Sequence, residues 1–154
     1  MSERYEIRPI GMVRGGRLDQ GDDRWGGIVS TIALDRERFG PETLAGLGDF
    51  SHVDVIFICH MVDERAISTR ARHPGNRFDW PLVGIFAERE ADRPNRLGLT
   101  TCELVGVAGV DVRVRGLDAT AGTPIVDLKP HITEGLPERT RQPAWISERL
   151  RNHW

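Results

Sequence analysis

Cysteine and long apolar runs are scarce in this sequence. Only two of its 154 residues are cysteines, Cys59 and Cys102, and each lies within an apolar, strand-like run. This placement favours two buried free thiols. No apolar run approaches the ~18 residues of a membrane-spanning helix, and no charged segment followed by an apolar one opens the sequence. These absences predict a soluble, cytoplasmic protein with no membrane contact.

Excess charge of either sign is also lacking. The formal net charge is -2, so the whole chain has no general attraction to polyanions, and a nucleic-acid contact would need a local basic face. The hydrophobic content of 39% and charged content of 29% are ordinary for a globular protein. A chain of this length can bury a sizeable core, and we expect residues 1–154 to form a single domain.

Familiar metal and phosphate motifs are absent. The five histidines are scattered, and no paired His or Cys-x-x-Cys spacing occurs, so the sequence predicts no bound metal. The seventeen glycines follow neither the P-loop nor the dinucleotide-binding pattern. Helix signals are sparse: a proline-started turn follows Gly40, and residues 143–154 combine a proline start with helical apolar spacing.

Strand-like runs, in contrast, fill the chain. The clearest is 110–118, where valines alternate with charged residues, and the run 53–60 is apolar enough to predict a strand buried on both faces. We predict a mostly β fold, a single compact β-barrel domain with short helices and a C-terminal helix, because barrel closure removes exposed strand edges. The seven runs are residues 5–14, 26–34, 53–60, 81–87, 97–107, 110–118 and 123–129.

A polar segment separates two of these runs. Arg89, Arg93 and Arg96 supply forked donors suited to carboxylates or phosphates, while Pro94 restricts the backbone and Asn95 offers an amide. A ligand site and a salt-bridged surface loop explain this composition equally well.

A long connection, residues 63–80, is rich in arginine. If the substrate is RNA, these arginines are the best candidates for its phosphate contacts. The alternative is a solvated loop in which they pair with neighbouring acids. The arginines are Arg65, Arg70, Arg72 and Arg77, and the acids are Asp63, Glu64 and Asp79.

Two further polar pairs have simpler interpretations. Ser51 and His52 enter a strand as neighbours, and since strand neighbours point to opposite faces we expect polar caps rather than a nucleophile and its base. Asp127 and Lys129 are two residues apart on one strand face, which favours a salt bridge.

Four ordered motifs resemble one known family. "IGMVR" at residues 10–14 resembles its opening Ile-Gly-x-x-Arg, and residues 47–60 resemble its Phe-Ser-His strand ending in histidine. Residues 83–100 resemble its long signature around Arg-Pro-Asn, and residues 117–132 resemble Asp-x-x-x-Gly-Thr-Pro-x-x-Asp-Ile-Lys-Pro-Tyr. On these motifs the chain is similar to the TrmO family, also called TsaA-like or YaeB-like.

The resemblance implies a function. Family members are small β-barrel methyltransferases that use S-adenosyl-L-methionine, act as homodimers with the cofactor near the subunit interface, and methylate N6 of threonylcarbamoyl-adenosine beside the tRNA anticodon. Either Asp127 or His60 could take the proton from that nitrogen. The residues that the resemblance assigns to the cofactor are Phe86, Ala87, Arg89, Arg93, Pro94, Asn95, Gly98, Leu99, Asp118, Gly122, Thr123, Pro124 and Lys129.

The chain departs from the family pattern at three places. Arg96 stands where the family has proline, and His131 stands where it has tyrosine. Residues 88–91 read Glu-Arg-Glu-Ala instead of Thr-Arg-Ser-Pro, which adds acids. Two alternatives therefore stay open: a methyltransferase with a non-tRNA substrate, and an S-adenosyl-L-methionine-binding regulatory module without catalysis.

Overall fold

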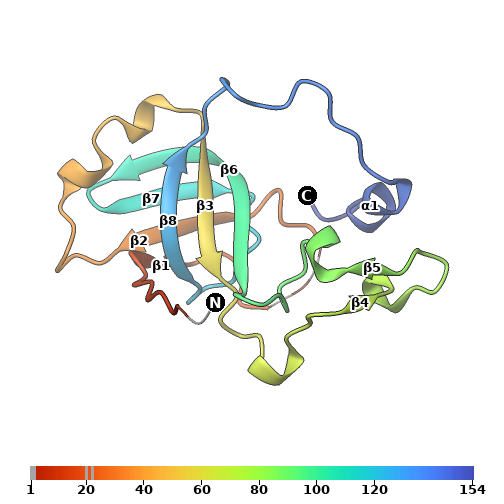
Figure 1. Cartoon of the computed structure of the whole chain (residues 1–154). Coiled ribbons are helices and arrows are strands. Elements are labelled where there is room, and N and C mark those ends of the chain that lie inside the picture. The colour runs from red at the N-terminus through yellow and green to blue at the C-terminus, as the bar shows by residue number, and fades with distance from the viewer. Residues whose placement is uncertain (1–2, 20, 22) are drawn as a thin grey trace.

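A closed barrel of six strands forms the body of the molecule (Figure 1). The computed structural model describes residues 3–19, 21 and 23–154. Neighbouring barrel strands are antiparallel and follow the order β1-β2-β7-β6-β3-β8. The closure confirms the predicted barrel. The barrel strands are β1 (Gly11–Arg14), β2 (Val29–Leu34), β3 (His52–Ile58), β6 (Leu97–Ala108), β7 (Asp111–Arg115) and β8 (Pro124–Pro130).

The core lies inside the barrel and follows the strand period of two. Val112 and Val114 of β7 are fully buried, as their alternation with charged residues predicted. Burying such a side chain contributes about 1.5–3 kcal/mol. The prediction that β3 is buried on both faces is wrong: Ile56 and Ile58 are only half-buried. Their side of the strand is the outer face of the barrel.

A smaller unit, the side module, flanks the barrel and is formed by residues 71–87 and 144–154 (Figure 1). Its sheet pairs β4 (Ala71–Arg72) with β5 (Val83–Gly84), and its helix is α1 (Ala144–Arg149). The rings of Trp80 and Trp145 pack at 6.1 Å between centroids, and Trp80 Nε1 donates to Glu148 Oε2 at 3.0 Å. These contacts dock α1 against the β4–β5 connection.

Three predicted elements differ in extent. Within residues 81–87 only β5 is a strand, and η5 (Ile85–Ala87) is a 3-10 turn, because β4 offers just two pairing residues. Of residues 5–14 only the last four form β1, which begins two residues after Pro9, a residue without a ladder N–H. The C-terminal helix is shorter than residues 143–154. Arg24 N–H and Trp25 N–H instead bind the carbonyls of Asn152 and His153, both at 2.7 Å.

The other short elements are 3-10 turns in the connections. Two of them lie in residues 40–50, where one or two helical turns were predicted. They are η1 (Pro41–Leu44), η2 (Leu47–Asp49), η3 (Glu64–Ala66) and η4 (Pro74–Asn76). None of the helices in the described part of the chain has the length and apolarity needed to cross a membrane.

Both cysteines are free thiols, as predicted, but their burial differs. Cys102 is fully buried inside the barrel, and Cys59 is half-buried at the cavity described below. Burial, with a smaller contribution from the nearby charge of Asp118, raises the pKa of the Cys102 thiol to about 12 and that of Cys59 to about 11. Both thiols are therefore protonated and unreactive near neutral pH.

Candidate functional site

A cavity of about 950 Å³ lies between the barrel and the side module. The volume lies within the range of small-molecule sites in proteins. The barrel supplies the ends of β3 and β6 and the connection from β7 to β8. The side module supplies Phe86, Trp145, Ile146, Arg149, Leu150, His153 and Trp154. The predicted site residues that line it are His60, Phe86, Arg89, Arg93, Gly98, Leu99, Asp118 and Thr123.

The polar segment after η5 joins the side module to the barrel. Arg89 Nη2 donates to the carbonyl oxygen of Leu99 on β6 at 2.8 Å, and Arg93 Nη1 donates to the carbonyl oxygen of Glu88 at 3.1 Å. Arg96 has a positive φ of 52° and donates from Nη1 to the carbonyl oxygen of Val62 at 3.1 Å. These bonds fix the backbone of the segment, so Arg89 and Arg93 line the cavity in set positions, whereas Arg96 is not part of its described lining.

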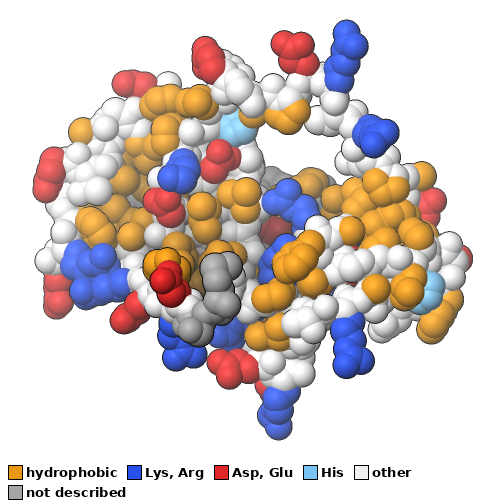
Figure 2. Space-filling model, viewed as in Figure 1, with side chains coloured by type: hydrophobic (Ala, Val, Ile, Leu, Met, Phe, Trp, Pro, Cys, Tyr) orange, Lys and Arg blue, Asp and Glu red, His pale blue; other side chains and the backbone are white. Residues whose placement is uncertain are grey.

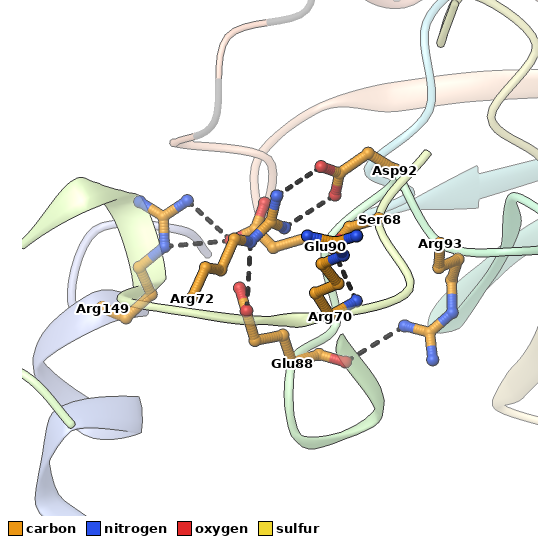
Figure 3. Close-up of polar contacts among 8 residues, drawn as sticks. All are labelled: Ser68, Arg70, Arg72, Glu88, Glu90, Asp92, Arg93 and Arg149. Carbon is orange, nitrogen blue, oxygen red and sulfur yellow. Dashed lines mark hydrogen bonds and ion pairs between the residues drawn. The ribbon is translucent and has the colours of Figure 1, made fainter. Parts of the chain in front are cut away.

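The acids of this segment bind arginines from distant parts of the chain (Figure 3). The Arg72 guanidinium of β4 contacts both carboxylate oxygens of Asp92 and, from Nε at 3.2 Å, Oε1 of Glu88. Arg149 of α1 pairs with Glu90 at 2.8 Å. We call Glu88, Glu90 and Asp92 the acidic triad. The triad ties the signature segment to β4 and to α1.

The electrostatics of the triad follow from these contacts. Hydrogen bonds from Arg72 hold the pKa of the Asp92 carboxyl below its usual range, and Asp92 in turn raises the pKa of Arg72. Glu88 is 4% exposed, and its Oε2 is buried without a hydrogen-bond partner among the described residues. A buried carboxylate of this kind depends strongly on its single ion pair.

The other arginines of residues 63–80 have local partners. Arg65 pairs with Asp63 at 3.0 Å, and Arg77 pairs with Asp79 and lies over the ring of Trp80. Both ion pairs agree with the alternative given from the sequence, in which these arginines pair with neighbouring acids. Arg70 is exposed, and only its backbone N–H has a recorded partner in the described chain, Ser68 Oγ at 3.4 Å. None of the four arginines lines the main cavity as far as it is described.

The second signature motif supplies one carboxylate to the cavity. Asp118 Oδ1 accepts a hydrogen bond from the Thr100 hydroxyl, and its Oδ2 lies 3.2 Å from His153 Nε2. Gly122, with φ of +88°, makes the turn that follows, and Thr123 is buried in the cavity wall. His153 was not predicted as a site residue, because it is 35 positions from Asp118 in the sequence.

The remaining signature residues lie elsewhere. Asp127 and Lys129 are on the outer face of β8 and form the predicted salt bridge, with Nζ 3.0 Å from Oδ2. Five others do not line the described cavity: Ala87, Pro94, Asn95, Gly122 and Pro124. The structure therefore divides the sequence-predicted site between the cavity and the outside of the barrel.

The outer sheet face, formed by the outward residues of β8, β3 and β6, connects these two parts. Figure 2 shows side chains of both charges and a histidine on this side of the barrel. Asp54 of β3 stands opposite Lys129 of β8 and Thr101 of β6, and Thr101 also lines the cavity. Thr101 Oγ1 donates to Asp54 Oδ1 at 2.6 Å, and His131 Nδ1 lies 3.0 Å from the same oxygen. No sequence pattern indicates this pairing across 77 positions.

The expectation that the side chains of Ser51 and His52 point to opposite faces is wrong. Ser51 Oγ lies 2.8 Å from His52 Nδ1. Ser51 precedes β3 and is in a bend, so the opposite-face rule for strand neighbours does not apply to it. Both residues are exposed and no cavity is described beside them, so the pair still lacks the surroundings of a nucleophile.

A ligand that fits this cavity combines charged and apolar groups. Arg89 and Arg93 suit a carboxylate, and Asp118 suits hydroxyl or ammonium donors. Phe57, Leu97 and the exposed Phe86 offer apolar surface for a planar ring. An adenosine joined to an amino acid has these features, so the side chains present fit S-adenosyl-L-methionine.

Fold and site together define a small β-barrel domain with a ligand-sized cavity outside the barrel, against an appended module. A family model described as the tRNA-methyltransferase O N-terminal domain matches residues 23–135. The chain belongs to this family, and the resemblance inferred from its motifs is confirmed.

Several relatives show the extent of the similarity. The chain is 34% identical over 102 residues to a human tRNA (adenine(37)-N6)-methyltransferase, covering 66% of this chain and 23% of that protein. It is 29% identical over 148 residues to an Escherichia coli protein of the same name, covering 87% and 61%. It is 36% identical over 128 residues to a probable S-adenosyl-L-methionine-binding protein of Methanothermobacter thermautotrophicus, covering 81% and 88%.

A solved structure agrees with the barrel. A crystal structure of TrmO superposes with a TM-score of 0.73 at 25% identity, covering 90% of this chain and 64% of that chain. The chain spans about a quarter of the length of the mammalian relatives that it matches.

Proposed function

We propose that this protein is an S-adenosyl-L-methionine-dependent methyltransferase that modifies N6 of a tRNA adenosine next to the anticodon. The carrying observation is the cavity, which brings Arg89 and Arg93 of one family signature to Asp118 and Thr123 of the other. Relatives named as methyltransferases of tRNA adenine 37 support the reaction and the substrate. A cytoplasmic location, the expectation from the sequence, belongs to the same proposal.

The residues have separable roles in this proposal. The arginines and Asp118 hold the ends of the cofactor, and the other signature residues, including Gly98 and Leu99, shape the space around it. Methyl transfer is an in-line displacement, so orienting the nitrogen and the methyl carbon supplies much of the rate enhancement. His60 at the cavity and Asp127 on β8 are the two proton acceptors that the sequence suggested.

A homodimer belongs to the same proposal. Lys129 and Asp127 lie on the outer sheet face, away from the described lining of their own chain's cavity, so a second copy could bring them to that cavity. Phe86 and Leu99 at the cavity are 79% and 50% exposed, which is unusual for apolar residues at a finished site. Covering them is a reason for the chain to pair.

Transfer of a labelled methyl group tests the function. Purified protein and labelled S-adenosyl-L-methionine are mixed with bulk tRNA from a strain that lacks this activity. The proposal expects label in the adenosine beside the anticodon and direct calorimetric binding of the cofactor. An Arg93→Ala variant serves as the matched loss-of-binding control.

The regulatory alternative has its own support. The Methanothermobacter relative, similar over most of its length, is named only for binding the cofactor. A binding module predicts tight cofactor binding and no label in tRNA or in a cell extract. Label in the extract but not in tRNA would instead point to a methyltransferase with another substrate.

Contacts with RNA are tested through salt. Arg65, Arg70 and Arg77 are exposed on the long connection, and each phosphate contact that is lost lowers the slope of log affinity against log salt by about one. The variant Arg65→Ala/Arg70→Ala should lower that slope by about one to two and leave cofactor affinity unchanged. An unchanged slope would show that these arginines do not touch the RNA.

A further inference from the structure

Asp54 and His131 form a carboxylate–imidazole pair at the edge of the candidate site. His131 Nδ1 lies 3.0 Å from Asp54 Oδ1 and 3.3 Å from Oδ2. The side chain of His131 is 28% exposed and that of Asp54 is 27% exposed, so the pair is largely shielded but reachable from solvent. Thr101 Oγ1 donates to the same carboxylate at 2.6 Å and also lines the cavity. One residue therefore separates the pair from the cavity.

The sheet fixes this pair in place. Backbone pairing sets Asp54 between Lys129 and Thr101, and His131 N–H donates to the carbonyl oxygen of His52 at 3.1 Å. Thr101 restrains one carboxylate oxygen, so the carboxylate can orient the ring in turn. A site on paired strands holds its geometry better than one on a loop.

The contact with Asp54 determines which ring nitrogen can act. A carboxylate accepts hydrogen bonds, so Nδ1 carries the proton and donates it to Asp54. In the neutral ring Nε2 is then unprotonated and can accept a proton. Carboxylates orient catalytic histidines in the same way in other enzymes. Imidazole is the commonest general base in enzymes.

We propose that His131, oriented by Asp54, is the general base of the methyl transfer, which deepens and rests on the function proposed above. As the substrate nitrogen bonds to the methyl carbon, the carbon–sulfur bond breaks and its electron pair stays on sulfur. The proton of that nitrogen passes to Nε2 of His131, which releases it to solvent. The products are a methylated nitrogen, a neutral thioether and one proton.

The two earlier candidates are less suited to this role. Asp127 Oδ1 accepts from the N–H of Leu128 at 2.9 Å, and its Oδ2 is paired with Lys129, so both oxygens already have partners. The His60 ring has no hydrogen-bond partner among the described residues, so nothing fixes its tautomer or direction. Of these three candidates, only His131 has an orienting carboxylate. His153 at the cavity also pairs with a carboxylate, but that carboxylate is Asp118, which the proposed function assigns to the cofactor.

Single-turnover kinetics with saturating cofactor test the proposal. His131→Asn should lower the rate of methyl transfer by about a hundredfold or more, the usual contribution of a general base, and leave cofactor affinity within about twofold. His52→Asn is the matched control, since its ring is 6.4 Å from that of His131 on the same face, and it should keep the wild-type rate. A wild-type rate in His131→Asn, or equal losses in both variants, would overturn the proposal.

A second measurement does not depend on activity. Long-range nitrogen–proton spectra of the imidazole rings should show neutral His131 protonated on Nδ1, and Asp54→Asn should abolish that preference. If His131 carries its proton on Nε2, the proposal fails even in an active protein. If wild-type protein transfers no methyl group but shows the Nδ1 tautomer, the proposed function fails and the orientation of the base stands.

The pH profile supplies a third readout. Protonation of Nε2 should stop transfer, so the single-turnover rate should rise with pH to a plateau, and this rise should be absent in His131→Asn. The His131 ring contacts Asp54 and lies near His52 of β3, and the strand register places Lys129 of β8 and Glu103 of β6 beside these two residues. An acid limb that persists in the variant would assign the titration to one of these neighbours and overturn the proposal.

Discussion

Arg72 shows how much one residue's role depends on its partners. Its sequence setting, an arginine-rich connection, suggested contact with RNA. In the structure its guanidinium lies between Asp92 and Glu88, two residues of the signature segment (Figure 3). The planar fork binds both oxygens of one carboxylate and one oxygen of the other, which a lysine could not do. Arg72 therefore orients the protein's own loop.

Removing Arg72 should destabilise the protein and weaken the cofactor site. Arg72→Ala leaves the buried Glu88 carboxylate without its ion pair, which should cost about 2–4 kcal/mol in chemical denaturation and raise the cofactor dissociation constant. Arg70→Ala, two positions away and exposed, should change stability by less than about 0.5 kcal/mol. Equal stability and cofactor affinity in the two variants would show that the ion pairs of Arg72 do not contribute to either.

The same contact makes stability depend on acid. The pKa of Asp92 is lowered in the folded protein, so its contribution to stability is present above the unfolded pKa of about 4 and is lost as pH falls through the folded pKa. Between neutral pH and a pH below both the folded and the unfolded pKa, the free energy of unfolding of wild type should fall by about 1 kcal/mol more than that of Asp92→Asn. Parallel stability curves for the two proteins would contradict this.

The signals available to sequence reasoning were local. The alternation of Val110, Val112 and Val114 predicted β7 because one strand face is buried, and the signature residues around Arg89 were found as a motif. Asp54 with His131, and Asp118 with His153, could not be found in this way. Their side chains meet only after strands close into a barrel and the tail returns to it.

At the scale of elements, the site depends on a helix that is short. α1 has six residues, too few to be stable by itself, so its place is set by tertiary contacts. Trp145 packs on Trp80, Glu148 accepts from the Trp80 indole, and Arg149 pairs with Glu90. The sequence predicted a helix here but not its length, because its end is fixed by bonds to Arg24 and Trp25.

Exchanging the charges of Arg149 and Glu90 tests this docking. Arg149→Glu and Glu90→Arg each place like charges together, and each should raise the cofactor dissociation constant by about tenfold as the wall of the cavity loosens. The double variant restores an opposite pair and should recover most of the loss. Additive losses in the double variant would show that the two residues act independently.

At the scale of the whole molecule, the cavity is shared between two parts. The barrel is held by a closed ladder and a buried core, whereas the side module has two two-residue strands and one short helix. The proposed ligand site therefore lies between a rigid part of the molecule and a less stable one. Cofactor binding should therefore order the side module more than the barrel.

A dimer is the prediction that belongs to this scale. We expect light scattering at micromolar concentration to give the mass of two chains, and Leu99→Glu at the exposed rim to give the mass of one. His52→Asn, on the same sheet face but away from the described cavity, should remain dimeric. A monomeric mass for wild type with cofactor bound would contradict the dimer.

The connection from β8 to α1 has a consequence for how the protein can be divided. Residues 132–143 are all exposed and arch away from the body in Figures 1 and 2. Their N–H and C=O groups are largely left to water, so a protease should cleave this arch before any barrel strand. The two fragments would still share the tryptophan packing and the Glu90 ion pair. A synthetic peptide of residues 143–154 should then restore cofactor binding to a barrel fragment that lacks these residues. The chain could thus be used as a split reporter, in which two fragments come together on binding the ligand.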